Sequence, residues 1–301
     1  MPEGIESTVS FPQPEMAFRN DTDRSIMIKT SYTDTSISVR IYGWNDGRIL
    51  AGAGTQRRVT LFNCFVMGVI EDSLDGIFDA LKEGALTMQQ GGGVGYDFST
   101  LRPRGSRARA TGAVASGPVS FMKGYDAFAG VIKSGGKTRR AAKMVILNVD
   151  HPDLMEFIEC KAREEKKAWA LMEAGYDGAV DGEAYGSIFF QNANNSVRVT
   201  DEFMKRVEQD GKWTTRERPT GETMDTYPAR DLMNKIAESC HICGDPGMQY
   251  DSTINRWHTC KTTSRINASN PCSEYMFLDN SACNLASVNL LKYLNEEGEF
   301  D

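Results

Sequence analysis

Apolar residues along this chain fall alternately into short runs and helical faces, a pattern that predicts an α/β fold. Residues 57–70, RRVTLFNCFVMGVI, are rich in β-branched and aromatic side chains and predict a largely buried strand. The residues that follow predict a helix, with Asp72 or Ser73 as its N-cap and Gly91 to Gly93 at its end. Gly91, Gly92, Gly93 and Gly95 predict a glycine-rich turn after this helix. Six apolar residues share one face of this helix: Leu74, Ile77, Phe78, Leu81, Ala85 and Met88.

The alternation continues along the chain, and residues 1–46 stand apart from it. Those first residues are polar, with β-branched stretches but no sustained period, so they predict an N-terminal segment to which we assign no role. Residues 47–301 form the second predicted region. The remaining elements predicted in this region are helices that begin at Pro118 and Pro152 and helices near 201–208 and 229–241. Strands are predicted within 143–149 and 187–199.

Composition limits the classes of function. The chain has 301 residues, 40% of them hydrophobic, which suits one or two domains with a sizeable core. A formal net charge of −7 argues against a general nucleic-acid binder, because binding to a phosphate backbone needs a basic face. With no secretory signal and no apolar run of about 20 residues, the protein is expected to be cytoplasmic and to make no membrane contact.

The seven cysteines are an odd number scattered from Cys64 to Cys283, unlike the framework of a small disulfide-linked fold. We therefore expect some of them to matter as thiols. Cys240 and Cys243 form a C-x-x-C, but no second pair has the spacing of a zinc site. We expect these two to pack at a helix end, and we expect no metal site.

The segment from Ser269 to Tyr275, SNPCSEY, carries the most informative set of reactive side chains. Pro271 excludes helix, so the segment must be extended or looped. In an extended chain Asn270, Cys272 and Glu274 would project to one side. Such a row aligns an amide, a thiol and a carboxylate along one ligand. A nucleophilic thiol normally has a histidine partner, and the nearest is 14 positions upstream of Cys272 (272 − 258 = 14). The alternative is that Cys272 is a buried structural thiol.

Several segments together resemble the ribonucleotide reductases. Residues 266–291, INASNPCSEYMFLDNSACNLASVNLL, are similar to the finger loop of that family. Residues 63–78, 90–106 and 132–147 resemble further family segments in the same order, so that the resemblance covers about residues 47–301. It implies a partial ten-stranded α/β barrel. The chain ends without an element that closes such a sheet, so we expect the other half of the barrel to come from further chain or from a partner.

The resemblance also implies roles for individual residues. Cys272 would be the thiyl radical site, Glu274 the base on the ribose 3′-hydroxyl and Asn270 a hydrogen-bonding residue for the ribose. Cys64 and Cys283 match the redox pair that becomes a disulfide. The positions implied for substrate or effector binding are Asp72, Gly92, Gly93, Lys133, Lys137, Arg139 and Arg140, with positive charge nearby from Arg102, Arg104, Arg107 and Arg109.

The implied reaction is the reduction of ribonucleoside di- or triphosphates to deoxyribonucleotides. Segments such as IKSGGKTRRAAKM favour the class II type, which uses adenosylcobalamin, although no D-x-H-x-x-G cobalamin motif is present. The implied partners are a deoxynucleoside triphosphate or ATP effector, a thioredoxin-like reductant and a second copy of the chain in a homodimer. Two alternatives stay open: a class I-type subunit that receives its radical from a partner subunit, and a catalytically silent nucleotide-binding fragment.

Overall fold

The computed structural model describes residue 56, residues 59–107, 112–132, 141–285 and 290–300, and the backbone of four strands within residues 6–42. The chain divides into two compact units. One unit comprises residues 1–63 and 282–301, and the other comprises residues 64–281. The predicted boundary after residue 46 remains a prediction.

The amino-terminal unit contains a four-stranded antiparallel sheet in the order β1-β2-β3-β4. Its strands are β1 (Glu6–Val9), β2 (Met16–Asn20), β3 (Ser25–Tyr32) and β4 (Thr35–Tyr42). The β-branched residues of SISVRIYGW thus lie mostly in β4. A short 3-10 helix, Leu290–Tyr293, also belongs to this unit.

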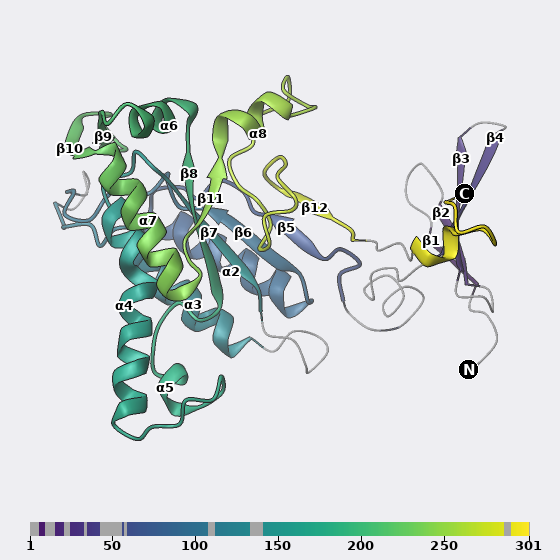
Figure 1. Cartoon of the computed structure of the whole chain (residues 1–301), viewed down its shortest axis with the longest axis horizontal. Coiled ribbons are helices and arrows are strands. Elements are labelled where there is room, and N and C mark those ends of the chain that lie inside the picture. The colour runs from purple at the N-terminus through teal and green to yellow at the C-terminus, as the bar shows by residue number, and fades with distance from the viewer. Residues whose placement is uncertain are drawn as a thin grey trace. The chain divides into compact units, whose positions relative to one another are not determined.

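The larger unit contains five strands of a six-stranded sheet of order β11-β8-β7-β6-β5-β12 (Figure 1), and only the first residue of β12 belongs to this unit. The strands from β11 to β5 pair in parallel, as expected where helices connect successive strands. The strands are β5 (Cys64–Val66), β6 (Gly93–Asp97), β7 (Lys143–Asn148), β8 (Ala193–Val199), β11 (Gly247–Tyr250) and β12 (Ser281–Cys283). A separate hairpin joins β9 (Lys212–Arg216) to β10 (Thr223–Pro228).

The helices are α2 (Leu74–Gln89), α3 (Pro118–Val131), α4 (Leu154–Glu173), α5 (Glu183–Gly186), α6 (Asp201–Glu208), α7 (Ala229–Cys243) and α8 (Asp251–Trp257). The helices α2, α3, α4, α6 and α7 lie where the sequence predicts helices, whereas the sequence does not predict α5 and α8. Ser73 caps α2 by accepting a hydrogen bond from the Gly76 amide at 3.0 Å, and Pro118 occupies the first turn of α3. Figure 1 shows α4 and α7, which pack on each other, side by side. Among the described residues, no helix is both long and apolar enough to cross a membrane.

Side chains that alternate along the strands divide this sheet into two faces. On β7, Val145 and Leu147 join the core under the helices, whereas Met144 and Ile146 join a smaller cluster with Ala268. The first set defines the helix face of the sheet. The second defines the loop face, because Ala268 belongs to a segment without regular structure, residues 265–280.

The structure confirms the predicted α/β class and corrects several details. The strand predicted within 57–70 is limited to β5, and α2 leaves Leu74 and Phe78 exposed at 62% and 57%. Cys240 is also exposed, so only Cys243 packs partly at the end of α7. The glycine-rich stretch predicted as a turn contains β6, in which Gly93 and Gly95 are strand residues.

Candidate active site

The segment 265–280 crosses the loop face of the sheet and carries the predicted reactive residues. Below, residues 265–275 are called the cysteine loop. Beneath it, β8 presents polar side chains and β6 presents glycine at alternate positions, whereas β7 presents Met144 and Ile146. On β8, Asn194 and Arg198 contact the loop, while Val197 and Val199 between and beyond them face the helices. The strand period therefore directs one set of residues to the core and the other to the loop.

The tip of the cysteine loop is a tight turn. The Ser273 amide donates to the Asn270 carbonyl at 3.2 Å, and Ser273 has a φ of +62°. The Asn270 amide donates to the Tyr275 carbonyl, and the Asn270 Oδ1 accepts from the Tyr275 amide, both at 3.0 Å. Of the two forms that the sequence allows, extended or looped, the segment therefore adopts the loop, and the row expected for an extended chain does not form. Asn270 is buried, whereas Cys272 and Glu274 are exposed.

Glycines on β6 let the loop approach the sheet. A Cβ atom on Gly95 would lie 1.6 Å from the Ser269 carbonyl oxygen, and one on Gly93 would lie 2.8 Å from Cγ of Pro271. No side chain fits at such distances, so the glycines are required where the loop lies directly on the strand. The same Gly93 position is 3.5 Å from the Cys64 sulfur, which places that thiol on the loop face.

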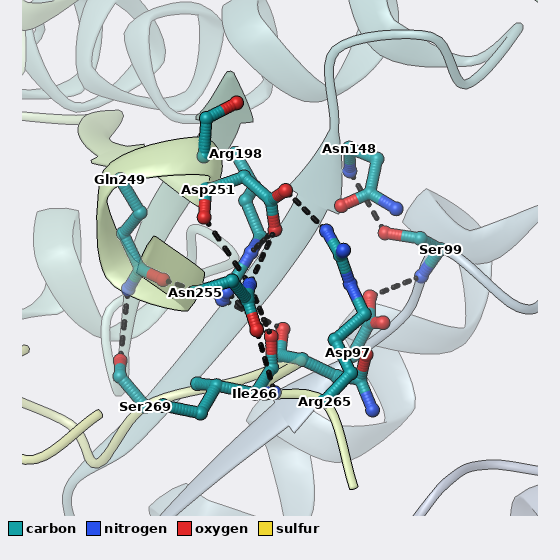
Figure 2. A network of polar contacts seen from close by, with 12 residues as sticks. Asp97, Ser99, Asn148, Arg198, Gln249, Asp251, Asn255, Arg265, Ile266 and Ser269 are labelled. Atoms are coloured by element: carbon teal, nitrogen blue, oxygen red, sulfur yellow. Dashed lines mark hydrogen bonds and ion pairs between the residues drawn. The ribbon is translucent and has the colours of Figure 1, made fainter. Parts of the chain in front are cut away.

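Buried charge holds the base of the cysteine loop (Figure 2). The Arg198 guanidinium is 2% exposed and donates to the Ile266 carbonyl at 2.6 Å and to the Asn267 carbonyl at 2.9 Å. Its Nε donates to Oδ1 of Asp251 at 2.6 Å, and Arg265 forms an ion pair with the same carboxylate. Removing one partner of a buried pair typically costs about 3–5 kcal/mol, so these charges fix the loop base firmly.

Gln249 on β11 connects the loop base to its tip. Its Oε1 accepts from Arg198 at 3.4 Å, and its Nε2 donates to the hydroxyls of Ser269 at 2.8 Å and Ser273 at 3.0 Å. From β8, Asn194 donates to the Pro271 carbonyl at 2.7 Å. The two residues next to Cys272 are thus both hydrogen-bonded to the sheet.

The polar groups at the tip suit a ligand with several hydroxyls. Partial burial, and then the charge of Glu274, raise the pKa of the Cys272 thiol, so it is mainly protonated at neutral pH. The Asn270 Nδ2 is buried and has no hydrogen-bond partner among the described residues. An unpaired buried amide is costly, and a hydrogen bond from it to a bound ligand would remove that cost.

Each of the two predicted redox cysteines is the terminal residue of a short strand. Cys64 is the first residue of β5 and Cys283 the last of β12, which is next to β5 in the strand order. Each thiol belongs to a side chain that is 9% exposed. Their pairing remains a prediction.

The other predicted binding residues are only partly described. Asp72 accepts hydrogen bonds from the Arg102 Nε at 2.7 Å and from the Arg102 amide at 3.0 Å, so its carboxylate is held next to a cation. A Cβ on Gly92 would meet the Phe65 ring at 2.6 Å, which gives that glycine a packing role. Lys133, Lys137, Arg139 and Arg140 lie outside the described residues, as does Arg109. Binding roles for this set remain predictions.

A polar cleft of about 510 Å³ adjoins the base of the cysteine loop. Arg198, Asp251 and Arg265 line it, together with residues at the carboxyl ends of β7 and β8 and on β9. Cys272 is not among its lining residues, so the cleft is separate from the reactive tip.

Sequence reasoning missed Arg198, Gln249 and Asn194. A signal existed for Arg198, because SVRV places a charged residue inside an alternating apolar strand, where an arginine needs a buried partner. For Gln249 and Asn194 the sequence offers no comparable signal, since amides are common on strand ends.

Comparison with known proteins identifies the protein family to which this sequence is similar. Residues 62–301 match the family described as "Ribonucleotide reductase, barrel domain". A protein of Rhodopirellula baltica named "Vitamin B12-dependent ribonucleotide reductase" is 53% identical over 241 residues, which cover 79% of this chain and 23% of that protein.

Two further relatives agree with this match. A Streptomyces avermitilis protein of the same name is 52% identical, over 82% of this chain and 25% of its own length. A Mycobacterium tuberculosis protein named "Vitamin B12-dependent ribonucleoside-diphosphate reductase" is 40% identical, over 78% of this chain and 30% of its own. The chain therefore spans about a quarter of the length of these relatives.

Proposed function

Because the chain belongs to the ribonucleotide reductase family, within its barrel domain, we propose that it forms part of a catalytic barrel that reduces ribonucleotides to 2′-deoxyribonucleotides. The overall reaction converts one ribonucleotide and two thiols into one deoxyribonucleotide, one disulfide and one water. The two electrons lost by the sulfurs are gained by the sugar. The names of the relatives describe this reaction, but this chain matches only about a quarter of their length.

The observation that carries the proposal is the tip of the cysteine loop. It presents an exposed thiol at Cys272 and an exposed carboxylate at Glu274 beside the buried side chain of Asn270, whose Nδ2 has no hydrogen-bond partner in the described part of the chain. A ribose offers adjacent hydroxyls that such an amide and carboxylate can bind. A raised thiol pKa favours the protonated form, which is what a residue that gives and takes a hydrogen atom requires.

We assign the steps to residues as follows. Cys272, as a thiyl radical, removes the 3′ hydrogen atom of the ribose and returns it at the end of the cycle. Glu274 accepts the proton of the 3′-hydroxyl, which allows the 2′-hydroxyl to leave as water. Cys64 and Cys283 supply two electrons and two protons and become a disulfide. Cys64 lies on the loop face, which supports its part in this assignment.

Adenosylcobalamin is the radical source that we propose, because the relatives named above are described as vitamin B12-dependent. When bound, it would supply the radical that converts the Cys272 thiol to its thiyl form. The exposure of Cys272 fits this role, since a bulky cofactor can reach the sulfur from the open side of the loop. Asn270 and Pro271 are buried behind it and hold the tip in place.

We propose the remaining partners because the chain belongs to this family. A deoxynucleoside triphosphate or ATP would act as effector near Asp72, whose carboxylate Arg102 orients. A thioredoxin-like reductant would restore the thiols, and the rest of the barrel would complete the substrate site. The alternative to this proposal is a nucleotide-binding fragment without turnover. Assaying the chain with and without the missing part separates the two.

Substitution of Cys272 by alanine in the completed enzyme tests the proposal. Deoxynucleotide formation should be abolished, while substrate affinity by equilibrium binding should stay within about twofold, because alanine removes the reactive atom but no binding group. Cys240→Ala, at another exposed cysteine, is the matched control and should be as active as the native enzyme. Retained product formation by Cys272→Ala would remove this residue from the mechanism.

A further inference from the structure

The position of Cys272 depends on residues that lie beneath the cysteine loop and do not reach its tip surface. The loop contains no helix or strand, so hydrogen bonds to the sheet must define where its thiol lies. Two anchors bind the residues on either side of Cys272. Asn194 binds the Pro271 carbonyl, and Gln249 binds the Ser273 hydroxyl.

The orientation of the Gln249 amide is set by a charge. Its oxygen accepts from Arg198, so its NH₂ group points to the two serines. Arg198 cannot act as an acceptor, so a reversed amide would place two donors against each other. Gln249 is 1% exposed, and water has little access to offer a substitute partner.

Arg198 is itself fixed in one position. Its guanidinium donates to the Asp251 carboxylate and to the carbonyls of Ile266 and Asn267. Asn255 holds the same stretch by accepting from the Ile266 amide at 3.0 Å. The arginine therefore fixes the loop base directly and the tip through Gln249.

We propose that Arg198 and Gln249 are positioning residues that set the place of the Cys272 thiol through a relay from Arg198 to Gln249 to the hydroxyls of Ser269 and Ser273. Neither residue takes part in the chemistry. The proposal deepens the proposed function, on which its importance rests, but the relay can be tested without any turnover.

The test is the alkylation rate of individual cysteines by iodoacetamide in the 301-residue chain, followed by peptide mapping. In Gln249→Met, which keeps the side-chain length and the buried ion pair, the Cys272 rate at pH 8 should rise about 3- to 10-fold relative to that of exposed Cys240. A freed loop is better solvated, so the pKa of the thiol should fall toward its ordinary value and the pH profile should shift with it. Arg198→Lys should have the same effect, because lysine lacks the planar fork that binds both carbonyls.

Controls separate positioning from loss of structure. Lys161→Met breaks the largely buried ion pair that joins α4 to Asp245, in the connection between α7 and β11. It should leave the Cys272 rate unchanged even if it lowers the melting temperature. Cys160, which is buried, reports unfolding and should stay unreactive in Gln249→Met. Unchanged Cys272 rates and pH profiles in Gln249→Met and Arg198→Lys would overturn the relay. That outcome would leave the proposed function intact, whereas activity of Cys272→Ala would overturn the function and not the relay.

Discussion

The helix face and the loop face of the sheet hold their covering segments by different interactions. On the helix face, residues such as Val145 and Leu147 bury apolar surface against α2, α3, α4, α6 and α7. On the loop face, Arg198, Gln249 and Asn194 bind the cysteine loop through directed hydrogen bonds. Apolar burial is non-directional and supplies stability, whereas hydrogen bonds to specific groups fix position. Packing on the helix face thus contributes most of the stability, and hydrogen bonds on the loop face hold the loop that carries Cys272.

The largest effect on stability should come from the helix face. Phe157 on α4 has no exposed surface, so Phe157→Ala should lower the free energy of unfolding by about 3–5 kcal/mol through lost burial and a residual cavity. Denaturant unfolding measures the loss. Under native conditions the Cys272 alkylation rate should not change, and a changed rate would show that the two faces are coupled.

An exposed residue at the loop tip should affect the rate and leave stability alone. Glu274→Gln in the completed enzyme should slow the chemical step by about 10²–10⁴-fold, the usual range for loss of a general base. Single-turnover kinetics measure this step. Glu173→Gln, at an exposed glutamate on the end of α4, is the control and should react at the native rate. Equal rates for native enzyme and Glu274→Gln would exclude Glu274 as the base.

A smaller effect on stability is expected where the loop meets β6. Gly95→Ala places a methyl group on the Ser269 carbonyl, so the loop or the strand must move, at a cost of about 1–3 kcal/mol. Gly124→Ala in α3, where a Cβ meets nothing within 4 Å, should be neutral or stabilising. Denaturant unfolding of both variants compares them. If Gly95→Ala were as stable as Gly124→Ala, the close contact between loop and strand would be wrong.

Most of the helix face could be predicted from the sequence. The periodicity and the cap at Ser73 locate α2, and Pro118 locates the start of α3, because these signals are local. Exposed Leu74 and Phe78 show the limit of such reasoning. A pattern marks which positions are apolar, but the width of the stripe that the sheet covers depends on tertiary packing.

The loop face could be predicted much less well. Gly93 and Gly95 suggest a turn, and only the loop lying on β6 explains why they occupy a strand. The fold of the tip depends on bonds between Asn270 and Tyr275 and on anchors from β8 and β11. These anchors lie 20 to 77 residues upstream of the residues that they bind (269 − 249 = 20; 271 − 194 = 77). The residue roles came from resemblance to a family, and the network that positions them came from the structure.

The central claim is that Cys272 starts the reaction and that Cys64 and Cys283 supply its electrons. The most direct test is to determine which cysteines have formed a disulfide after one turnover. The completed enzyme, with any cysteines beyond residue 301 replaced by serine, is given one equivalent of substrate without reductant, and its disulfides are mapped by peptide analysis. We predict one Cys64–Cys283 disulfide per deoxynucleotide formed, with Cys240 and Cys243 reduced, and no disulfide in Cys272→Ala. A Cys240–Cys243 disulfide with Cys64 and Cys283 still reduced would contradict the account.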